Sequence, residues 1–234
     1  MPLLEIVTSS GLGSLLGMRH ALEPDHLAAV STLVSDERSS YKAAFLGICW
    51  GLGHTLSLVV VGAALVVLRA EMPAGMTDFF EFGVALMLVG LGVRAMLAAA
   101  RQGASGPATV HHHGQLVHRH AGAPAHVHVG GWTLARRPLL VGAVHGLAGS
   151  GALTALVLAT LPTTMARLTY MTLFGLGSTV SMAALSGLLG WPIAHFGKRE
   201  SVARGVSLLV GCTSTVLGVF WGYPLVARAL GFRL

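Results

Sequence analysis

The sequence predicts an all-α, polytopic membrane protein, and its composition excludes the other common classes. Of its 234 residues, 53% are hydrophobic and only 10% are charged, whereas about 25% of the residues in an ordinary soluble domain are charged. The 15 basic and 9 acidic side chains are too few to cover the surface of a soluble protein of this length. The apolar content excludes a disordered chain, and two cysteines exclude a disulfide framework.

Six apolar stretches have the length of a membrane span, which takes roughly 20 residues. They are Leu3–Val34, Ala43–Leu68, Phe79–Ala100, Leu139–Leu161, Leu168–Phe196 and Val206–Leu230. The first stretch is too long for one straight span and has polar residues near its middle. Pro24 removes a backbone donor and disfavours helix at Glu23, so we expect one helix that is broken near Pro24.

The basic residues lie mostly between the apolar stretches, which argues against nucleic-acid binding despite a net charge of +6. Ten of them lie in or beside the connections between spans 1 and 2, 3 and 4, and 5 and 6, and four lie in or beside the other connections and the C-terminus. Cytoplasmic loops carry an excess of Lys and Arg. This asymmetry predicts a multi-pass protein of the plasma (inner) membrane with both termini outside.

The two halves of the chain resemble each other. GLGHTLSLVVVG, which begins at Gly51, aligns with GLGSTVSMAALSG, which begins at Gly175, at an offset of 124. His20-Ala-Leu aligns with His145-Gly-Leu at an offset of 125. We therefore expect three helices in residues 1–100, a loop in 101–138 and three helices in 139–234. Three spans per half invert the second half, which is the 3+3 inverted-topology repeat of secondary transporters. The alternative is chance recurrence of Gly, Leu and Val in membrane helices.

Ionisable residues gather in the segments that the repeat relates. His20, Asp25 and His26 form an H-x-x-x-x-D-H array. On a regular helix Asp25 would lie about 140° and His26 about 240° from His20, so the three need the helix break to turn inward together. With His54 and His145 they predict a site for a divalent transition metal, because imidazole binds nickel, cobalt, copper and zinc well. The alternative is interhelical hydrogen bonding, although ionisable groups inside a bilayer usually indicate function.

Three further polar residues are weaker candidates for the metal site or its pathway. Glu23 either attracts cations at the mouth of the site or forms a structural ion pair with Arg19. Ser150 and Ser178 take the repeat-equivalent places of two site residues, Asp25 and His54. Both serines are otherwise interpreted as hydroxyls that pack between helices.

Seven of the twelve histidines fall in the predicted loop: His111, His112, His113, His118, His120, His126 and His128. The segment is rich in Gly, Ala and Pro and has no apolar period, so we expect a disordered, cytoplasmic loop. We interpret it as an accessory metal-binding tether. The alternative is a flexible linker whose histidines have little effect.

Four motifs together resemble those of the nickel/cobalt transporter family: RHALEPDHL at Arg19–Leu27, LGHTLS at Leu52–Ser57, HGLAGSGAL at His145–Leu153 and FGLGSTVSM at Phe174–Met182. The closest resemblance is to the short, urease-accessory-type nickel permeases of that family. It implies that His20, Asp25 and His26 are required for nickel or cobalt transport and that His54 takes part from the next span. It also implies cytoplasmic metallochaperones, or urease or hydrogenase maturation proteins, as partners.

The resulting prediction is a secondary transporter for uptake of Ni²⁺ or Co²⁺, with no enzymatic activity and no resident cofactor. An ATP-binding P-loop is absent from the sequence. A nickel or cobalt exporter is the first alternative, because nothing in the sequence determines direction. A membrane thiol–disulfide electron carrier is the second, but Cys49 and Cys212 are much further apart than the repeat offset.

Overall fold

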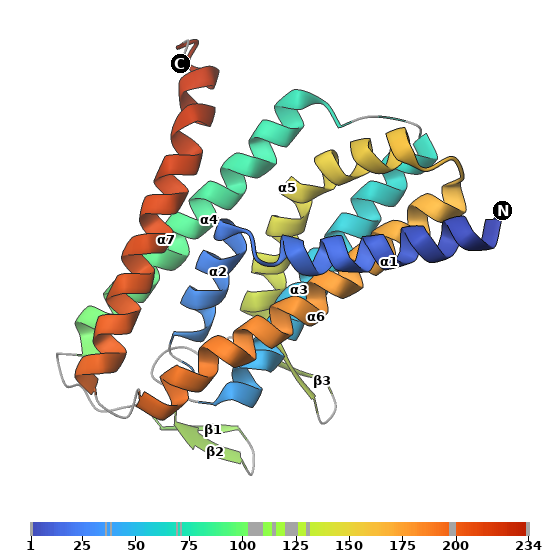
Figure 1. Cartoon of the computed structure of the whole chain (residues 1–234). Coiled ribbons are helices and arrows are strands. Elements are labelled where there is room, and N and C mark those ends of the chain that lie inside the picture. The colour runs from blue at the N-terminus through green and yellow to red at the C-terminus, as the bar shows by residue number, and fades with distance from the viewer. Residues whose placement is uncertain are drawn as a thin grey trace.

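The computed structural model is a bundle of long helices (Figure 1). It describes residues 2–35, 37, 39–68, 70, 72–102, 110–113, 116–119, 126–129, 132–196 and 200–232. The helices in these residues are α1 (Pro2–His20), α2 (Pro24–Val34), α3 (Ser40–Leu68), α4 (Ala74–Gln102), α5 (Arg136–Thr160), α6 (Thr164–Phe196) and α7 (Glu200–Ala229). They cover all six predicted spans, and the first span is divided between α1 and α2.

The break between α1 and α2 lies where the sequence predicted it. Glu23 has an extended backbone, with φ −64° and ψ 148°, and Pro24 is the first residue of α2. A proline disfavours helical backbone at the residue before it and suits the first position of a new helix. The N–H of Glu23 still donates to the carbonyl of His20 at 3.0 Å, which closes a tight turn. The chain therefore leaves α1 and enters α2 in a new direction (Figure 1).

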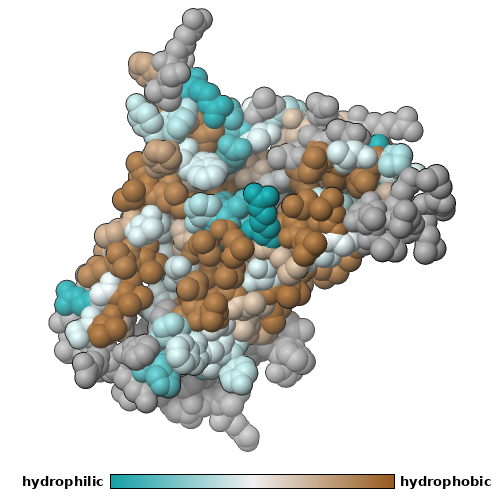
Figure 2. Space-filling view, viewed as in Figure 1, coloured by the Kyte–Doolittle hydropathy of each residue, from teal (hydrophilic) through white to brown (hydrophobic). Residues whose placement is uncertain are grey.

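The surface of the bundle is strongly apolar. Four of the described helices, α3, α4, α6 and α7, are long and apolar enough to cross a membrane by length and composition. Large hydrophobic side chains on these helices face outward, among them Val60, Phe79, Leu188 and Phe220. Figure 2 shows hydrophobic residues over much of the visible face, interrupted by a hydrophilic patch near the end of α1. Such a surface is unfavourable in water and is typical of contact with lipid.

Helix α3 occupies the centre of the packing and lies along both α5 and α6. Helix α1 packs along α6, α4 packs along α7, and the short α2 lies mainly against α7. One hydrophobic core forms around Trp50, Leu88 and Met182, and a second forms around Leu58 and Met171. Helices α3 and α6 contribute to both cores, α2 contributes to the first, and α5 contributes to the second, against which Leu16 of α1 packs.

Glycines let the central helices touch through their backbones. A Cβ atom on Gly142 of α5 would overlap the carbonyl oxygen of Trp50 in α3. A Cβ atom on Gly17 of α1 would likewise overlap the carbonyl oxygen of Phe174 in α6. These two contacts are equivalent, because Gly17 and Gly142 are 125 positions apart and Trp50 and Phe174 are 124 apart, which are the offsets found in the sequence.

The α3–α6 contact has the same reciprocity. Gly51 packs against Thr179, and Gly175 packs against Thr55. The hydroxyl of Thr55 donates to the carbonyl of Gly175 at 2.8 Å and lies 2.9 Å from the hydroxyl of Thr179. Thr55 and Thr179 are themselves 124 positions apart. Each half of the chain thus contributes an equivalent glycine and an equivalent threonine to this contact.

The histidine-rich segment differs from its prediction. It contains two antiparallel hairpins, one of β1 (Val110–His113) with β2 (Leu116–Arg119) and one of β3 (His126–Val129) with β4 (Trp132–Ala135). The prediction of disorder is therefore wrong for these residues. Valine and histidine alternate in β3, and β-branched residues favour extended backbone. The positions of the seven histidine side chains lie outside the described part, as does all of His120.

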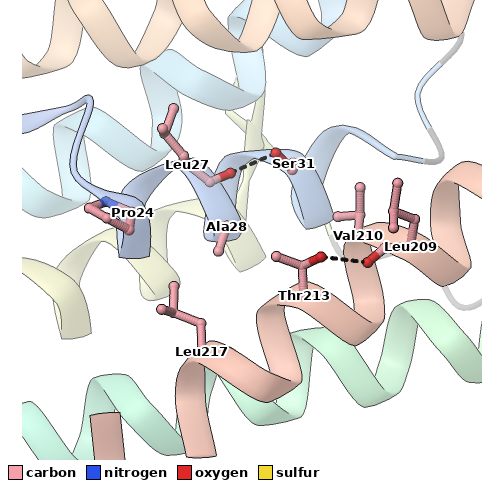
Figure 3. A pocket seen from close by; sticks show the side chains of 8 residues that line it. All are labelled: Pro24, Leu27, Ala28, Ser31, Leu209, Val210, Thr213 and Leu217. Carbon is pink, nitrogen blue, oxygen red and sulfur yellow. Dashed lines mark hydrogen bonds between the residues drawn. The ribbon is translucent and has the colours of Figure 1, made fainter. Parts of the chain in front are cut away.

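A groove of about 390 Å³ lies between α2 and α7. Its lining is Pro24, Leu27, Ala28, Ser31, Leu209, Val210, Thr213 and Leu217 (Figure 3). The two hydroxyls in this lining are used within their own helices. Ser31 donates to the carbonyl of Leu27 at 2.6 Å, and Thr213 donates to the carbonyl of Leu209 at 2.9 Å. Because both hydroxyl protons are used in this way, the lining of the groove is largely apolar. The groove runs along one side of the short helix α2.

Candidate metal site

The five predicted ligands come together from four helices. His20 ends α1, Asp25 and His26 lie in the first turn of α2, His54 lies in the middle of α3, and His145 lies in α5. Asp25, His26, His54 and His145 are buried, and His20 is partly buried. The break at Pro24 makes this possible because it lets α1 and α2 present their polar residues toward the same point.

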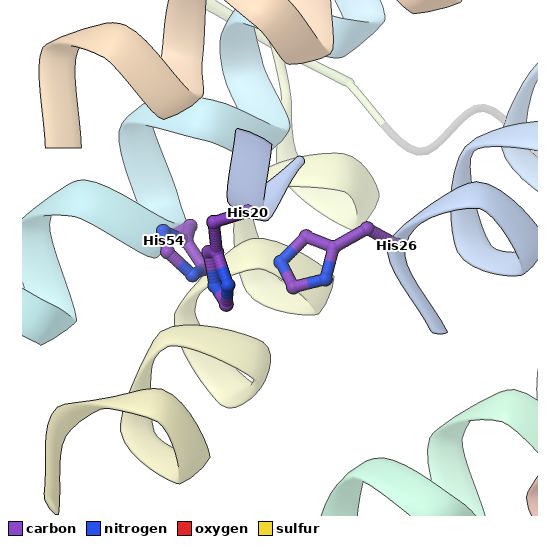
Figure 4. A group of neighbouring side chains, drawn as sticks. All are labelled: His20, His26 and His54. Carbon is purple, nitrogen blue, oxygen red and sulfur yellow. The ribbon is translucent and has the colours of Figure 1, made fainter. Parts of the chain in front are cut away.

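Three imidazoles form the centre of the cluster: His20, His26 and His54 (Figure 4). Each offers one nitrogen, and these nitrogens all lie within 4.8 Å of one another. The ring centroid of His20 is 4.3 Å from that of His26 and 5.4 Å from that of His54. Nitrogens at this separation need only small movements to surround one metal ion, since Zn–N bonds are about 2.0–2.1 Å long.

Asp25 and His145 form the adjoining part of the cluster. The two oxygens of the Asp25 carboxylate contact different histidines, with Oδ1 3.0 Å from Nδ1 of His26 and Oδ2 2.7 Å from Nε2 of His145. Asp25, His26 and His145 also make up a group with ligand atoms within 4.8 Å of one another. His26 belongs to both groups, and its ring centroid is 4.1 Å from that of His145.

Several buried nitrogens of the cluster have no hydrogen-bond partner among the described residues. They are Nε2 of His26, both ring nitrogens of His54 and Nδ1 of His145. A buried polar atom without a partner is costly. A neutral imidazole nitrogen with a free lone pair is a good ligand for a divalent transition metal. The donor set therefore fits such an ion, and a buried position requires the ion to lose its water.

The side of the cluster next to His20 approaches the surface. Oε2 of Glu23 lies 3.0 Å from Nδ1 of His20, and the Glu23 side chain is 53% exposed, compared with 17% for His20. Glu23 thus pairs with a histidine of the cluster.

The other predicted residues do not join the cluster among the described side chains. Ser178 is fully buried in α6, and its hydroxyl donates to Sδ of Met182 at 3.9 Å. The side chain of Ser150 lies outside the described residues. The two cysteines are on different helices: Cys49 is buried in α3, and Sγ of Cys212 lies 3.5 Å from Sδ of Met96. Cys49 is therefore not paired with Cys212.

Two aromatic residues border the site without having been predicted to do so. The ring of Trp50 is 5.5 Å from that of His26 and 5.9 Å from that of His145. The ring of Phe174 is 5.3 Å from that of His20. Each stands directly before the repeated Gly-Leu-Gly, at an offset of 124. The repeat was the signal that would have identified them, but an aromatic residue in an apolar span is normally interpreted as core.

Comparison with known proteins gives a relative that matches over almost the whole length of both chains. The urease accessory protein UreH of Bacillus sp. (strain TB-90) is 30% identical over 232 residues, which cover 99% of this chain and 96% of UreH. No protein-family model matches the chain, and no solved structure matches it.

Two chloroplast proteins are more distant relatives. The proteins FOR GROWTH AND FERTILITY 1 and 2 of Arabidopsis thaliana are 26% and 25% identical to this chain. The match covers 97% and 98% of this chain, but only 61% and 59% of the plant proteins. The match to UreH covers nearly all of both proteins. It agrees with the urease-accessory type that the histidine motifs indicated. The chain therefore belongs to the family of the urease accessory protein UreH.

Proposed function

We propose that the chain is a secondary transporter that moves Ni²⁺, or Co²⁺, into the cell across the plasma membrane. The observation that carries this proposal is the cluster of four histidines and one aspartate inside an apolar helix bundle, of which all but the partly exposed His20 are buried. Ionisable groups in such a place are expensive, so they are retained for a function. Nitrogen-rich sites favour nickel and its neighbours over magnesium or calcium, which prefer oxygen ligands.

The membrane potential supplies a driving force for import. With the inside negative, entry of a cation is favoured by roughly 2.3 kcal/mol per charge per 100 mV, and by twice that for a divalent ion. The ion is held by imidazoles, which compensate for the water that it loses. Import also agrees with the name of the relative, because an accessory protein of a nickel enzyme has a use for nickel inside the cell.

The transport mechanism in this proposal is alternating access between two inverted repeats. One repeat consists of α1 to α4, and the other consists of α5 to α7. The reciprocal contacts of Thr55 with Gly175 and of Thr179 with Gly51 support a pseudo-two-fold axis between α3 and α6. The outer helices are related in the same way. Helix α1 of the first repeat packs on α6 of the second, and α5 of the second repeat packs on α3 of the first. In this arrangement both termini lie outside and the histidine-rich segment is cytoplasmic.

The groove beside α2 provides room for the movement that opens the site. Helix α2 has 11 residues and carries Asp25 and His26. A shift of α2 toward α7 would separate these two residues from His54 and His145. We expect a Thr213→Phe variant, which fills the groove, to lower nickel uptake several-fold while the purified protein still binds Ni²⁺.

A matched control for this variant is Thr172→Phe. Thr172 is also exposed, and its hydroxyl also donates to the carbonyl four residues earlier, at 2.9 Å, but it does not line the groove. Uptake by the Thr172→Phe protein should match that of the wild type. Equal uptake by the two phenylalanine variants would contradict a role of the groove in transport.

The direct test of the proposed function follows radioactive nickel in cells that express the chain. We expect these cells to accumulate more nickel than cells without it. If preloaded cells instead lose nickel faster than control cells, the chain is an exporter and the proposed direction is wrong. Nickel content equal to that of control cells, with the protein present in the membrane, would contradict transport altogether.

Two accessory roles belong to the same proposal. The seven loop histidines bind metal on the cytoplasmic side, weakly and with variable stoichiometry, and transport does not depend on them. Proteins of urease or hydrogenase maturation, or a metallochaperone, receive the imported ion. The support for such partners is the name of the relative UreH, a urease accessory protein.

A further inference from the structure

The contacts of Asp25 differ from those expected of a metal ligand. Its Oδ1 accepts two hydrogen bonds, one from the backbone N–H of His26 at 2.9 Å and one from Nδ1 of the same residue at 3.0 Å. Its Oδ2 accepts a hydrogen bond from Nε2 of His145 at 2.7 Å. Both oxygens of this buried carboxylate therefore have donors, and each imidazole donates through a different nitrogen.

These hydrogen bonds determine which nitrogen of each histidine has a free lone pair. A neutral imidazole carries its proton on one nitrogen and accepts on the other. His26 donates through Nδ1, so Nε2 is the free nitrogen, and this atom is buried without a partner among the described residues. In His145 the order is reversed, and Nδ1 is free. A carboxylate behind a histidine commonly selects the tautomer and the ring orientation in metal sites.

One ring nitrogen of His26 points toward His20 (Figure 4), and His26 forms a group of close ligand atoms with His20 and His54. Because Nδ1 is bonded to Asp25, Nε2 is the nitrogen of His26 that remains for an ion in this group. His54 has no hydrogen-bond partner on either nitrogen in the described part of the chain, so nothing competes with an ion for it. The ring centroid of His145 is 4.1 Å from that of His26 but 6.3 Å from that of His54, and its Nε2 is bonded to Asp25.

We propose that Asp25 is a positioning residue and not a ligand. It holds His26 in the Nδ1–H tautomer, so that Nε2 binds the transported ion together with His20 and His54. His145 supports the carboxylate from the opposite side by donating Nε2–H to Oδ2. This inference rests on the proposed function, since it assigns roles within the same site, and it predicts an ion bound by three imidazoles with no protein carboxylate.

The first test does not need metal. In full-length protein labelled with ¹⁵N-histidine, nitrogen NMR distinguishes imidazoles protonated at Nδ1 from those protonated at Nε2. We expect one buried histidine of the metal-free wild type to have the Nδ1–H signature and to lose it in Asp25→Ala, whose side chain has no acceptor. If no buried histidine has this signature, or if Asp25→Ala leaves it in place, the positioning role is wrong.

The second test counts ligands by X-ray absorption of the purified protein loaded with Ni²⁺. We expect three imidazoles in the wild type and the same three in Asp25→Asn at saturation, with an affinity lower by about 10–100-fold. In His145→Gln, whose amide can still donate to Oδ2, the imidazole count should stay at three, and the affinity should fall less than in His145→Ala. His195→Ala is the control for removal of a histidine outside the site.

The outcomes separate this inference from the proposed function. Loss of a short oxygen ligand in Asp25→Asn, or a drop to two imidazoles in His145→Gln, would overturn the positioning role while nickel binding stands. If the wild type binds no Ni²⁺ but has the Nδ1–H signature, the hydrogen-bond assignment holds and the proposed function fails.

Discussion

We expect replacement of His26 by alanine to abolish the proposed nickel uptake in cells that express the protein. His26 belongs to both groups of ligand atoms, so its loss removes a nitrogen from the three-histidine group and one hydrogen bond from Asp25. The remaining imidazoles cannot compensate an ion for the water that it loses on entering the bundle. The measurement is the initial rate of radioactive nickel uptake, normalised to the amount of protein in the membrane.

The matched control for His26→Ala is His195→Ala. His195 is exposed near the end of α6, where its ring stacks on Trp191 with a centroid distance of 5.4 Å. This variant also removes one imidazole from the chain, but outside the cluster, and it should transport nickel at the wild-type rate. Full uptake by His26→Ala would invalidate the assignment of the site.

We expect replacement of Gly142 by alanine to destabilise the protein strongly for a change of one methyl group. The new Cβ atom would overlap the carbonyl oxygen of Trp50, a backbone atom that moves only if α3 and α5 separate. Overpacking of this kind costs about 1–3 kcal/mol, and more where the backbone is the obstacle. Separation of α3 from α5 also displaces His54 from His145. We expect a lower Tm in detergent and reduced nickel binding.

Gly90→Ala is the control for this variant, because it makes the same chemical change in the middle of another helix. A Cβ atom on Gly90 of α4 has no atom of the described chain within 4 Å. Alanine is a better helix former than glycine by about 1 kcal/mol, so the Tm of Gly90→Ala should be equal to or above that of the wild type. Equal Tm values for the Gly142 and Gly90 variants would show that the α3–α5 contact is looser than described.

The sequence predicted the helix break and the residues of the cluster because both depend on local chemistry. Proline acts on the residue directly before it, and the extended backbone at Glu23 is the result. The histidine motif was visible because ionisable residues are rare in apolar spans. The hairpins of the histidine-rich segment were missed since its Gly, Ala and Pro content outweighed the alternation of valine and histidine in β3.

The contacts that distinguish the residues within the cluster could not be predicted from the sequence. Asp25 and His145 are 120 positions apart, and no spacing rule states that the carboxylate accepts from that imidazole. Trp50 and Phe174 were likewise overlooked, because an apolar helix gives no sign of which aromatic side chain faces the polar cluster.

By itself, then, the sequence predicted a helical, strongly apolar protein, the break at Pro24 and a cluster of polar residues: His20, Asp25, His26, His54 and His145. Hydropathy, the effect of proline on the residue before it and the ligand chemistry of each side chain depend on local sequence, so they can be recognised before the fold is known. Only the tertiary structure decided that His20, His26 and His54 form one group while Asp25 joins His26 to His145. That arrangement depends on α3 approaching α5 and α6 through glycine contacts, which set distances between residues far apart in the sequence.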